Sequence, residues 1–109
     1  MSDSSATVLC TYRVKLGKET EFRVLLRQHG PKLRELGLVV DEPSTLYRGL
    51  DEQQRPYFVE IFRWKSEAAA QKAHQHPEVL VIWEPMDALC EARDGRPNME
   101  FPHVERVLL

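Results

Sequence analysis

Apolar and polar positions follow two different periods along the chain, and the order of these periods predicts the fold. The segments are strand-like over 7–14, helical over 18–36, strand-like over 45–50 and 57–64, helical over 66–92 and strand-like over 99–107. Alternation every second residue marks the strands, and apolar residues three and four apart mark the helices. The order β-α-β-β-α-β predicts a ferredoxin-like α+β fold, in which a four-stranded antiparallel sheet carries helices on one face.

Proline and glycine positions divide these segments further. Gly30-Pro31 interrupts the first helical stripe, but the apolar spacing resumes in phase after it, which predicts a kinked helix or two abutting helices. The second helical stretch is expected to break at 74–77, with Pro77 at the first position of the following helix. Pro102 lacks an N–H for pairing, so we expect the last strand to be an edge strand or a bulged one.

The segment 57–64 has the strongest strand pattern, because it is apolar on both faces. One face carries Tyr57, Val59 and Ile61, and the other carries Phe58, Phe62 and Trp64 around Glu60. Such a strand is expected at the centre of a sheet with both faces covered. Helices on one side leave the other face bare, and a bare apolar face favours association. We therefore expect a homodimer that packs sheet against sheet and buries on the order of 800 Å² of each subunit.

Composition and charge describe an ordinary globular domain. Of the 109 residues, 42% are hydrophobic and 29% are charged, which suits one domain over 7–109 after a disordered tail at 1–6. The net charge of −2, without any Lys/Arg run longer than two residues, favours neither nucleic acid nor an anionic membrane as a partner. The apolar runs are too short to span a bilayer, and the polar residues 1–6 do not resemble a signal peptide.

The two cysteines of the chain give an indication of its cellular compartment. Cys10 falls in a strand and Cys90 in a helical stretch, and they form no CxxC pair. We expect both to be buried, reduced thiols of a cytoplasmic protein. A disulfide between them stays open as the less favoured alternative.

Two segments of the sequence resemble antibiotic biosynthesis monooxygenase-type domains. The entry into the first helix, 17–22 (GKETEF), is similar to the corresponding entry in that family. The segment 59–69 (VEIFRWKSEAA), continued to His74, resembles its aromatic third strand, its Ser-capped turn and the helix that follows. The likeness extends over 7–107 and implies a dimeric α+β barrel. Members of the family include cofactor-independent quinone-forming monooxygenases and haem-degrading enzymes, so one fold supports several functions.

The resemblance implies a cavity between the helices and the sheet of each subunit. Oxidation of a phenol or hydroquinone without a cofactor needs surfaces that hold a flat ring, a group that accepts a proton, and donors that steady the anion. No metal ion or other cofactor is expected to take part. We expect catalytic roles for His74, Trp64 and Glu60, and substrate binding by Tyr12, Tyr47, Arg48, Tyr57 and Trp83.

Structural roles compete for the same residues. His74 lies near a helix C-terminus, where a histidine favours the helix dipole whatever the function. Trp83 fits the apolar stripe of its helix as a core residue, and Trp64 can pack the following helix against the sheet. Glu60, on an apolar strand face, must be paired, hydrogen-bonded or protonated. For this carboxylate we favour an internal salt bridge, with Arg13, Arg48 or Arg63 as the partner.

Three functions stay open from the sequence. The first is a cofactor-independent monooxygenase that oxidises a small aromatic or quinol-type compound, and the second is a non-catalytic dimeric module that binds a small ligand or regulates. The third is haem binding and degradation, but the haem-degrading branch has an asparagine on its first strand, where this chain has Thr11-Tyr12-Arg13. Metal binding is not favoured, because the spacing of the histidines at 74, 76 and 103 matches no familiar ligand set.

Overall fold

The computed structural model describes residues 6–109, and its elements follow the predicted order. The elements are β1 (Ala6–Tyr12), α1 (Glu19–Glu35), β2 (Thr45–Leu50), β3 (Pro56–Trp64), α2 (Glu67–Ala73), α3 (Pro77–Ala88), β4 (Met99–Glu100) and β5 (His103–Val104). The tail expected at 1–6 lies outside the described residues except for Ala6, which begins β1. The ferredoxin-like α+β fold predicted from the sequence is confirmed.

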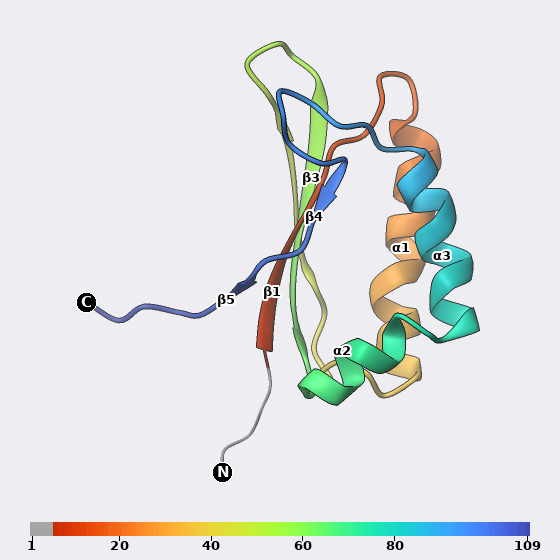
Figure 1. The fold of residues 1–109 in the computed structure, drawn as a ribbon, viewed down its shortest axis with the longest axis vertical. Helices are drawn as coiled ribbons and strands as arrows, with labels where there is room; N and C mark the ends of the chain where they lie inside the picture. Colours follow the sequence, from red (N-terminus) through yellow and green to blue (C-terminus); the bar gives the residue numbers. More distant parts are fainter. Residues whose placement is uncertain (1–5) are drawn as a thin grey trace.

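The strands form one antiparallel sheet in the order β2-β3-β1-β4, with β5 also paired to β1 (Figure 1). Cys10 lies opposite Glu60 across the central pair of strands. The last strand, expected over 99–107, is shorter and divided. The backbone N–H of Leu9 donates to the carbonyl of Pro102 at 3.0 Å, between the β4 and β5 pairings. The register is the same in both pairings, so no extra residue is inserted and the alternative of a bulge is wrong. The alternative of an edge strand is confirmed, and the ladder is interrupted at Pro102 because proline has no N–H with which to continue it.

α1 supplies one wall of the interior. Its buried positions include Phe22, Leu26, His29 and Leu33, which recur at helical spacing and form the buried side of the helix. The helix is continuous through Pro31, so the alternative of two abutting helices is wrong.

The second helical stretch breaks at the predicted place. Ser66 caps α2, because its hydroxyl accepts a hydrogen bond from the backbone N–H of Ala69 at 3.0 Å. His74 is the C-cap of α2. His76 is the N-cap of α3, and Pro77 takes the first helical position as expected. α3 lies beside α1, whereas α2 crosses one end of the sheet (Figure 1).

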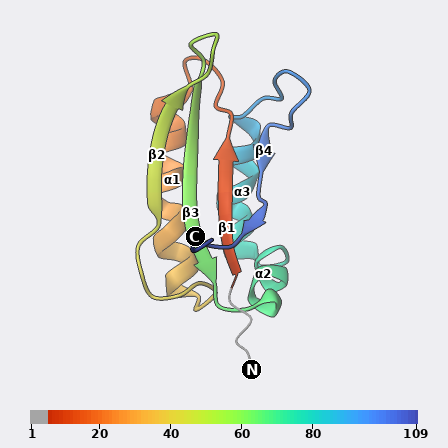
Figure 2. The same ribbon diagram turned by 90° about the vertical axis from the view of Figure 1, so that its left-hand side faces the viewer.

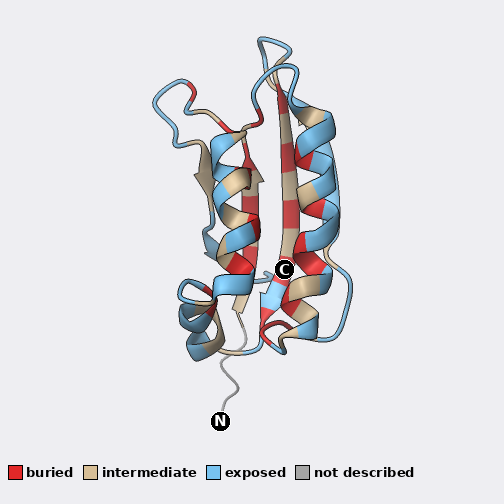
Figure 3. Cartoon of the chain, turned by 90° about the vertical axis from the view of Figure 1, so that its right-hand side faces the viewer, coloured by how far each residue is buried: buried red, intermediate tan, exposed pale blue. Residues whose placement is uncertain are grey.

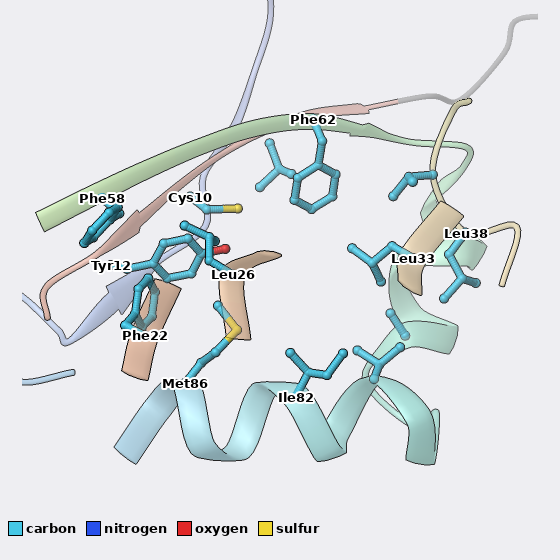
Figure 4. Packing of buried hydrophobic residues seen from close by; sticks show 14 of the residues in the cluster. Cys10, Tyr12, Phe22, Leu26, Leu33, Leu38, Phe58, Phe62, Ile82 and Met86 are labelled. Carbon is cyan, nitrogen blue, oxygen red and sulfur yellow. The ribbon is translucent and has the colours of Figure 1, made fainter. Parts of the chain in front are cut away.

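The core fills the space between the sheet and the helices. Figure 3 shows buried residues along the central strands and on the sides of the helices that face them. In Figure 4, Cys10 and Phe62 point from the sheet toward Ile82 and Met86 of α3. Full burial of a large apolar side chain stabilises a fold by about 1.5–3 kcal/mol. This packing holds the inward-facing polar residues of β1 and β3 in one position.

No helix of residues 6–109 covers the opposite face of the sheet (Figure 2). Tyr57, Val59 and Ile61 of β3 lie on this outer face and are half-buried, and Tyr47 of β2 is 60% exposed beside them. We expected both faces of β3 to be covered. Within a single chain only its inner face is covered. The residues after β5 leave the sheet on this outer side (Figure 1).

Both cysteines, Cys10 and Cys90, are buried and free, so the alternative of a disulfide between them is wrong. Burial raises the pKa of the Cys90 thiol to about 12, and burial together with the charge of Glu60 raises the pKa of Cys10. Both side chains are therefore neutral thiols at neutral pH. Within residues 6–109, none of the helices has both the length and the apolar character needed to cross a bilayer.

Candidate active site

A cavity of about 160 Å³ lies between the helices and the sheet. Its lining includes Tyr12, Phe62 and Trp64 from the sheet, His29 from α1, His74 and Trp83 from the α2–α3 region, and Phe101 and His103 from the C-terminal segment. The walls are thus mainly apolar and aromatic, with histidines among them. An engineered protein cavity of about 150 Å³ holds benzene, so a space of this size suits a single aromatic ring.

Four side chains from four different elements join in one hydrogen-bond network, of which Trp83, His29 and Tyr12 line this cavity and Glu60 lies behind them. Trp83 Nε1–H donates to His29 Nε2 at 2.8 Å. His29 Nδ1 lies 2.8 Å from Glu60 Oε1, and the hydroxyl of Tyr12 donates to the same oxygen at 2.7 Å. We call these four residues the Glu60 network. Because α3, α1, β3 and β1 each contribute one member, the network ties both layers of the fold together.

The network defines where the proton of His29 lies. An indole N–H can only donate, so the Nε2 atom that faces Trp83 must accept. An ionised carboxylate can only accept, so Nδ1 carries the proton and donates to Glu60. His29 is therefore a neutral imidazole whose lone pair lies at Nε2, on the side of Trp83.

Electrostatics keep the carboxylate of the network charged. Burial disfavours a charge on Glu60, which is only 1% exposed. The electrostatic pull of the His29 N–H, the hydrogen bonds from His29 and Tyr12, and the nearby hydroxyl of Ser44 together outweigh burial, so the pKa of the Glu60 carboxyl lies below its ordinary value. Burial, followed by the charge of Glu60, raises the pKa of Tyr12 well above its ordinary value. At neutral pH the network thus holds a carboxylate beside a neutral phenol.

The second oxygen of the carboxylate, Glu60 Oε2, lies toward α1. Among residues 6–109 it has no partner in good hydrogen-bond geometry, although the hydroxyl of Ser44 is near enough to lower the pKa. A Cβ atom placed on Gly30 would lie 3.1 Å from Ser44 Oγ and 3.9 Å from Glu60 Oε2. Gly30 therefore leaves room for Ser44 beside the carboxylate, which explains a glycine inside a helix despite its cost of about 1 kcal/mol relative to alanine.

The predicted arginine partner of Glu60 is wrong. Arg13 binds Glu100 at 2.6 Å, Arg48 binds Glu19 at 2.6 Å, and Arg63 binds Glu42 at 3.3 Å. These arginines stay at or near the surface, where the guanidinium keeps part of its hydration and avoids the cost of burial. The partners inside the protein are instead an imidazole and a phenol, which reach Glu60 as neutral donors.

His29 is the candidate site residue that sequence reasoning missed. Its position belongs to the apolar stripe of the first helix, and the stripe by itself suggests only a core residue. A useful signal was present, since an ionisable side chain on the buried face of a helix needs a polar partner inside. Glu60 was the one ionisable side chain on the corresponding face of the central strand.

The structure brings two further predicted site residues, Trp64 and His74, to the cavity. Trp64 is 5% exposed and packs edge-on against Phe62, with 5.1 Å between the ring centroids. The ring of His74 lies 5.0 Å from the ring of Trp83. Because His74 is exposed while His29 is buried, His74 lies at the mouth of the cavity and His29 lies inside it.

Three predicted substrate-binding residues lie away from this cavity. Tyr47 and Tyr57 lie on the outer face of the sheet, because they alternate with the inward positions of β2 and β3. Arg48 is on the helix side, but it belongs to the edge strand β2 and pairs with Glu19 of α1. Only Tyr12 and Trp83 of the predicted binding residues line the cavity.

A larger hollow, of about 490 Å³, lies at the β2–β3 hairpin end of the sheet. Its arginines already bind carboxylates, as Arg55 does with Asp51 at 2.8 Å and Arg93 does with Glu91 at 2.9 Å. The smaller apolar cavity, with convergent polar groups, is the better candidate site. No group of three or more His, Cys, Asp or Glu side chains among residues 6–109 is arranged to hold a metal ion.

Comparison with solved structures identifies the class of fold. SnoaB, a cofactor-independent oxygenase from Streptomyces nogalater, matches with a TM-score of 0.72 at 19% identity, covering 99% of this chain and 97% of that one. A proposed antibiotic biosynthesis monooxygenase from Nitrosomonas europaea matches with a TM-score of 0.67 at 9% identity, over 98% and 94%. A dimeric ferredoxin-like protein of unknown function from Jannaschia matches with a TM-score of 0.58 at 17% identity, over 94% and 100%. No family model and no curated protein matches the sequence.

The chain therefore has the fold of SnoaB and of proteins described as antibiotic biosynthesis monooxygenases, which is the fold that its sequence resemblance implied. At these identities the likeness establishes the fold alone, because one fold supports many functions. What the cavity does depends on the side chains that line it.

Proposed function

We propose that this protein is a cofactor-independent monooxygenase that oxidises a small phenol or hydroquinone. One observation supports the proposal most: an apolar cavity of single-ring size has one buried base at its wall. The neutral imidazole of His29 has its lone pair at Nε2, which accepts from Trp83 in this structure and would accept from a ring hydroxyl once Trp83 moves aside. Glu60 stabilises the imidazolium that forms when a proton is taken. An imidazole oriented by a buried carboxylate serves as a general base in this way in other enzymes.

The proposed reaction begins when His29 removes the proton of a ring hydroxyl. The phenolate transfers one electron to molecular oxygen, and the phenoxyl radical and superoxide combine into a carbon-bound peroxide anion. His29 returns its proton to the outer oxygen, the O–O bond breaks as the ring proton at that carbon is lost, and the departing hydroxide takes up that proton as water and leaves a carbonyl. One oxygen atom ends in the quinone and the other in water, so no external reductant is required.

The walls of the cavity support this chemistry. Phe62 and Trp64 provide apolar and aromatic surface for a flat ring. A phenolate held against such walls is less well solvated than in water, which favours loss of an electron. A volume of about 160 Å³ favours a single-ring substrate. Fused ring systems would require movement at the mouth, beside His74.

Oxygen uptake with hydroquinones and small phenols tests the proposal. We expect turnover above the buffer rate, and a loss of about a hundredfold or more in kcat for His29→Ala, because general acid–base catalysis contributes roughly 10²–10⁴. His76→Asn is the matched control, since asparagine retains an N-cap for α3 and this position does not line the cavity. Full turnover by folded His29→Ala would contradict the proposal.

A non-catalytic module that binds a small ligand is the second candidate, and one contact favours it. Trp83 already donates to His29 Nε2, so the lone pair of the base is engaged in this structure. Such a cavity can hold a ring without reacting with it. Saturable binding of phenol with no oxygen uptake would favour this candidate over the monooxygenase.

Haem binding finds little support in the cavity, because a porphyrin is several times larger than a single ring. The polar side chains in the interior also hydrogen-bond to one another within the Glu60 network, so they are not free to bind a haem. A Soret band on titration with haemin would nevertheless favour haem as the ligand.

We also propose that the protein forms a homodimer through the outer face of the sheet. Val59 and Ile61 are half-buried there, next to exposed Tyr47, and no element within residues 6–109 covers them. A structure of this fold described as dimeric supports the proposal. Exposed Leu108 and Leu109 follow β5 on the same side and would add apolar area to the interface.

The cytoplasm is the compartment that we propose for this protein. Its two cysteines are buried free thiols, as expected in a reducing compartment. Its net charge of −2 gives little affinity for nucleic acid or anionic membranes.

A further inference from the structure

A hydrogen-bond donor and an acceptor face each other at the wall of the cavity. The donor is Trp83 Nε1–H and the acceptor is His29 Nε2, and 2.8 Å separates the two nitrogens. Both side chains line the cavity, so a ligand there lies against both of them. His29 is bound on its other side by Glu60. Trp83 has no such second bond among the described residues, because its indole has a single N–H.

The two side chains differ in their freedom to move. His29 is 2% exposed and packs edge-on against Phe62, with 5.9 Å between the ring centroids. Trp83 is half-buried, and its neighbour His74 is exposed. A small displacement of Trp83 therefore opens the space between Nε1 and Nε2 while His29 stays in place.

Only some chemical groups satisfy both atoms at once. A group inserted between them must accept from the indole N–H and donate to the imidazole lone pair. A hydroxyl does both, whereas an ether or a carbonyl oxygen only accepts and leaves His29 Nε2 unpaired. Sites that hydrogen-bond a hydroxyl discriminate strongly against analogues that lack it, because a buried polar group is then left without a partner.

We propose that Trp83 and His29 form a hydroxyl-recognition pair, in which the ring hydroxyl of the ligand inserts between Trp83 Nε1–H and His29 Nε2. The ligand class is therefore ring compounds that carry a free hydroxyl, and aryl ethers and quinones are excluded from this position. If the ring compound is a substrate, which rests on the proposed function, the pair also separates substrate from product. The quinone cannot donate to Nε2, so Trp83 returns to His29 as the product leaves.

Trp83 acquires a second role from the same geometry. When His29 takes the proton of the inserted hydroxyl, the indole N–H faces the oxygen that becomes negative. A fixed donor in an apolar site stabilises such an oxyanion. Trp83 is then a substrate-binding residue through its N–H rather than through stacking of its ring.

Binding of phenol and of anisole, measured under argon, tests the pair. The two compounds share one ring, but anisole has a methyl group in place of the hydroxyl hydrogen. In protein labelled with ¹⁵N, we expect phenol to shift the indole N–H signal of Trp83 and anisole to leave it nearly unchanged. The indole signal of Trp64 is the internal control, since Trp64 lines the same cavity without joining the network.

A second test removes the acceptor atom, His29 Nε2, by replacing three members of the Glu60 network with apolar residues. The triple substitution His29→Leu, Glu60→Leu and Tyr12→Phe replaces the polar partners together, so no buried carboxylate is left unpaired. We expect the ratio of phenol to anisole affinity to fall by about five- to tenfold, the value of one net hydrogen bond. Comparing ratios cancels the different transfer of the two compounds from water.

Every outcome of these binding experiments either supports or overturns the proposed recognition pair. Equal effects of phenol and anisole on the Trp83 signal, or no binding of either compound, would overturn the inference. If the triple variant does not fold, the Trp83 signal of the unmodified protein still gives the answer. Oxygen uptake is not involved: donor-selective binding without turnover overturns only the proposed monooxygenase, and turnover without donor selectivity overturns only the recognition pair.

Discussion

His29 Nδ1 and Glu60 Oε1 lie 2.8 Å apart in the interior of the protein, and the two side chains are 3% and 1% exposed. The first belongs to α1 and the second to β3, so this hydrogen bond joins the helical layer to the sheet. Because both groups are buried, loss of this contact is expected to lower the stability of the fold: a buried polar group that loses its partner recovers no hydrogen bond from water.

Substitution of Glu60 tests the stability contributed by this contact. We expect Glu60→Leu to lower the free energy of unfolding by about 2–4 kcal/mol, since His29 and Tyr12 both lose their acceptor. Glu60→Gln retains a side-chain oxygen acceptor and is expected to lose only about 1 kcal/mol. Urea denaturation measures both. Equal destabilisation by the two substitutions would show that the hydrogen bonds to Oε1 matter little.

Stability is expected to fall in acid because of the same carboxyl. Burial raises the pKa of Glu60 in the folded protein, but the electrostatic pull of the His29 N–H and the hydrogen bonds to the carboxylate outweigh it and lower the pKa. A group with a lowered folded pKa stabilises the fold above its unfolded pKa and loses that contribution as the pH falls through the folded pKa. We expect Tm to decrease below the ordinary glutamate pKa, near 4.5, and the Glu60→Gln variant to show a smaller decrease.

Substitution of Ser44 tests whether its hydroxyl lowers the pKa of the Glu60 carboxyl. Its hydroxyl helps to lower the pKa of Glu60, so Ser44→Ala should raise that pKa and move acid unfolding to higher pH. Ser44→Thr keeps the hydroxyl and should behave like the unmodified protein. Thermal unfolding followed by circular dichroism across acidic pH distinguishes the two variants. An unchanged midpoint in Ser44→Ala would indicate that Ser44 does not act on Glu60 Oε2.

The thiols of the folded protein are expected to be unreactive. Burial raises the pKa of Cys90 to about 12, and Cys10 is buried as well. Since the thiolate is the reactive form, a thiol reagent at neutral pH should modify neither residue until the protein unfolds. Mass spectrometry before and after denaturant addition measures the modification. Rapid labelling of the native protein would show that the core around these residues opens readily.

A charge on the outer face of the sheet should disrupt the proposed dimer. Ile61→Lys places an ammonium group in the centre of the apolar face, and we expect it to yield a folded monomer. Arg63→Lys is the matched control on the same strand, because this position is already charged and exposed. Size-exclusion chromatography with light scattering gives the mass. A monomer of the unmodified protein at micromolar concentration would contradict the dimer.

Local patterns account for most of the fold. The period of two in 57–64 placed Glu60 on the same face as Phe58 and Phe62, and the structure has this arrangement. The break at 74–77 followed from a proline that can begin a helix but not continue one. Glu60 is also conspicuous in the sequence, as a carboxylate among apolar neighbours. These features depend on residues close together in the chain.

The partner of that carboxylate depended on the tertiary structure. His29 and Glu60 are 31 residues apart, and the helical period says only that His29 lies on the buried side of α1. Which residue of that side meets Glu60 depends on where the helix crosses the sheet and how it is rotated, and α3 then decides that Trp83 meets His29. The sequence by itself determined the elements, their order and their buried faces, because these follow from local periodicity. The tertiary structure alone decided the Glu60 network and the ring-sized cavity, because both arise where separate elements pack together.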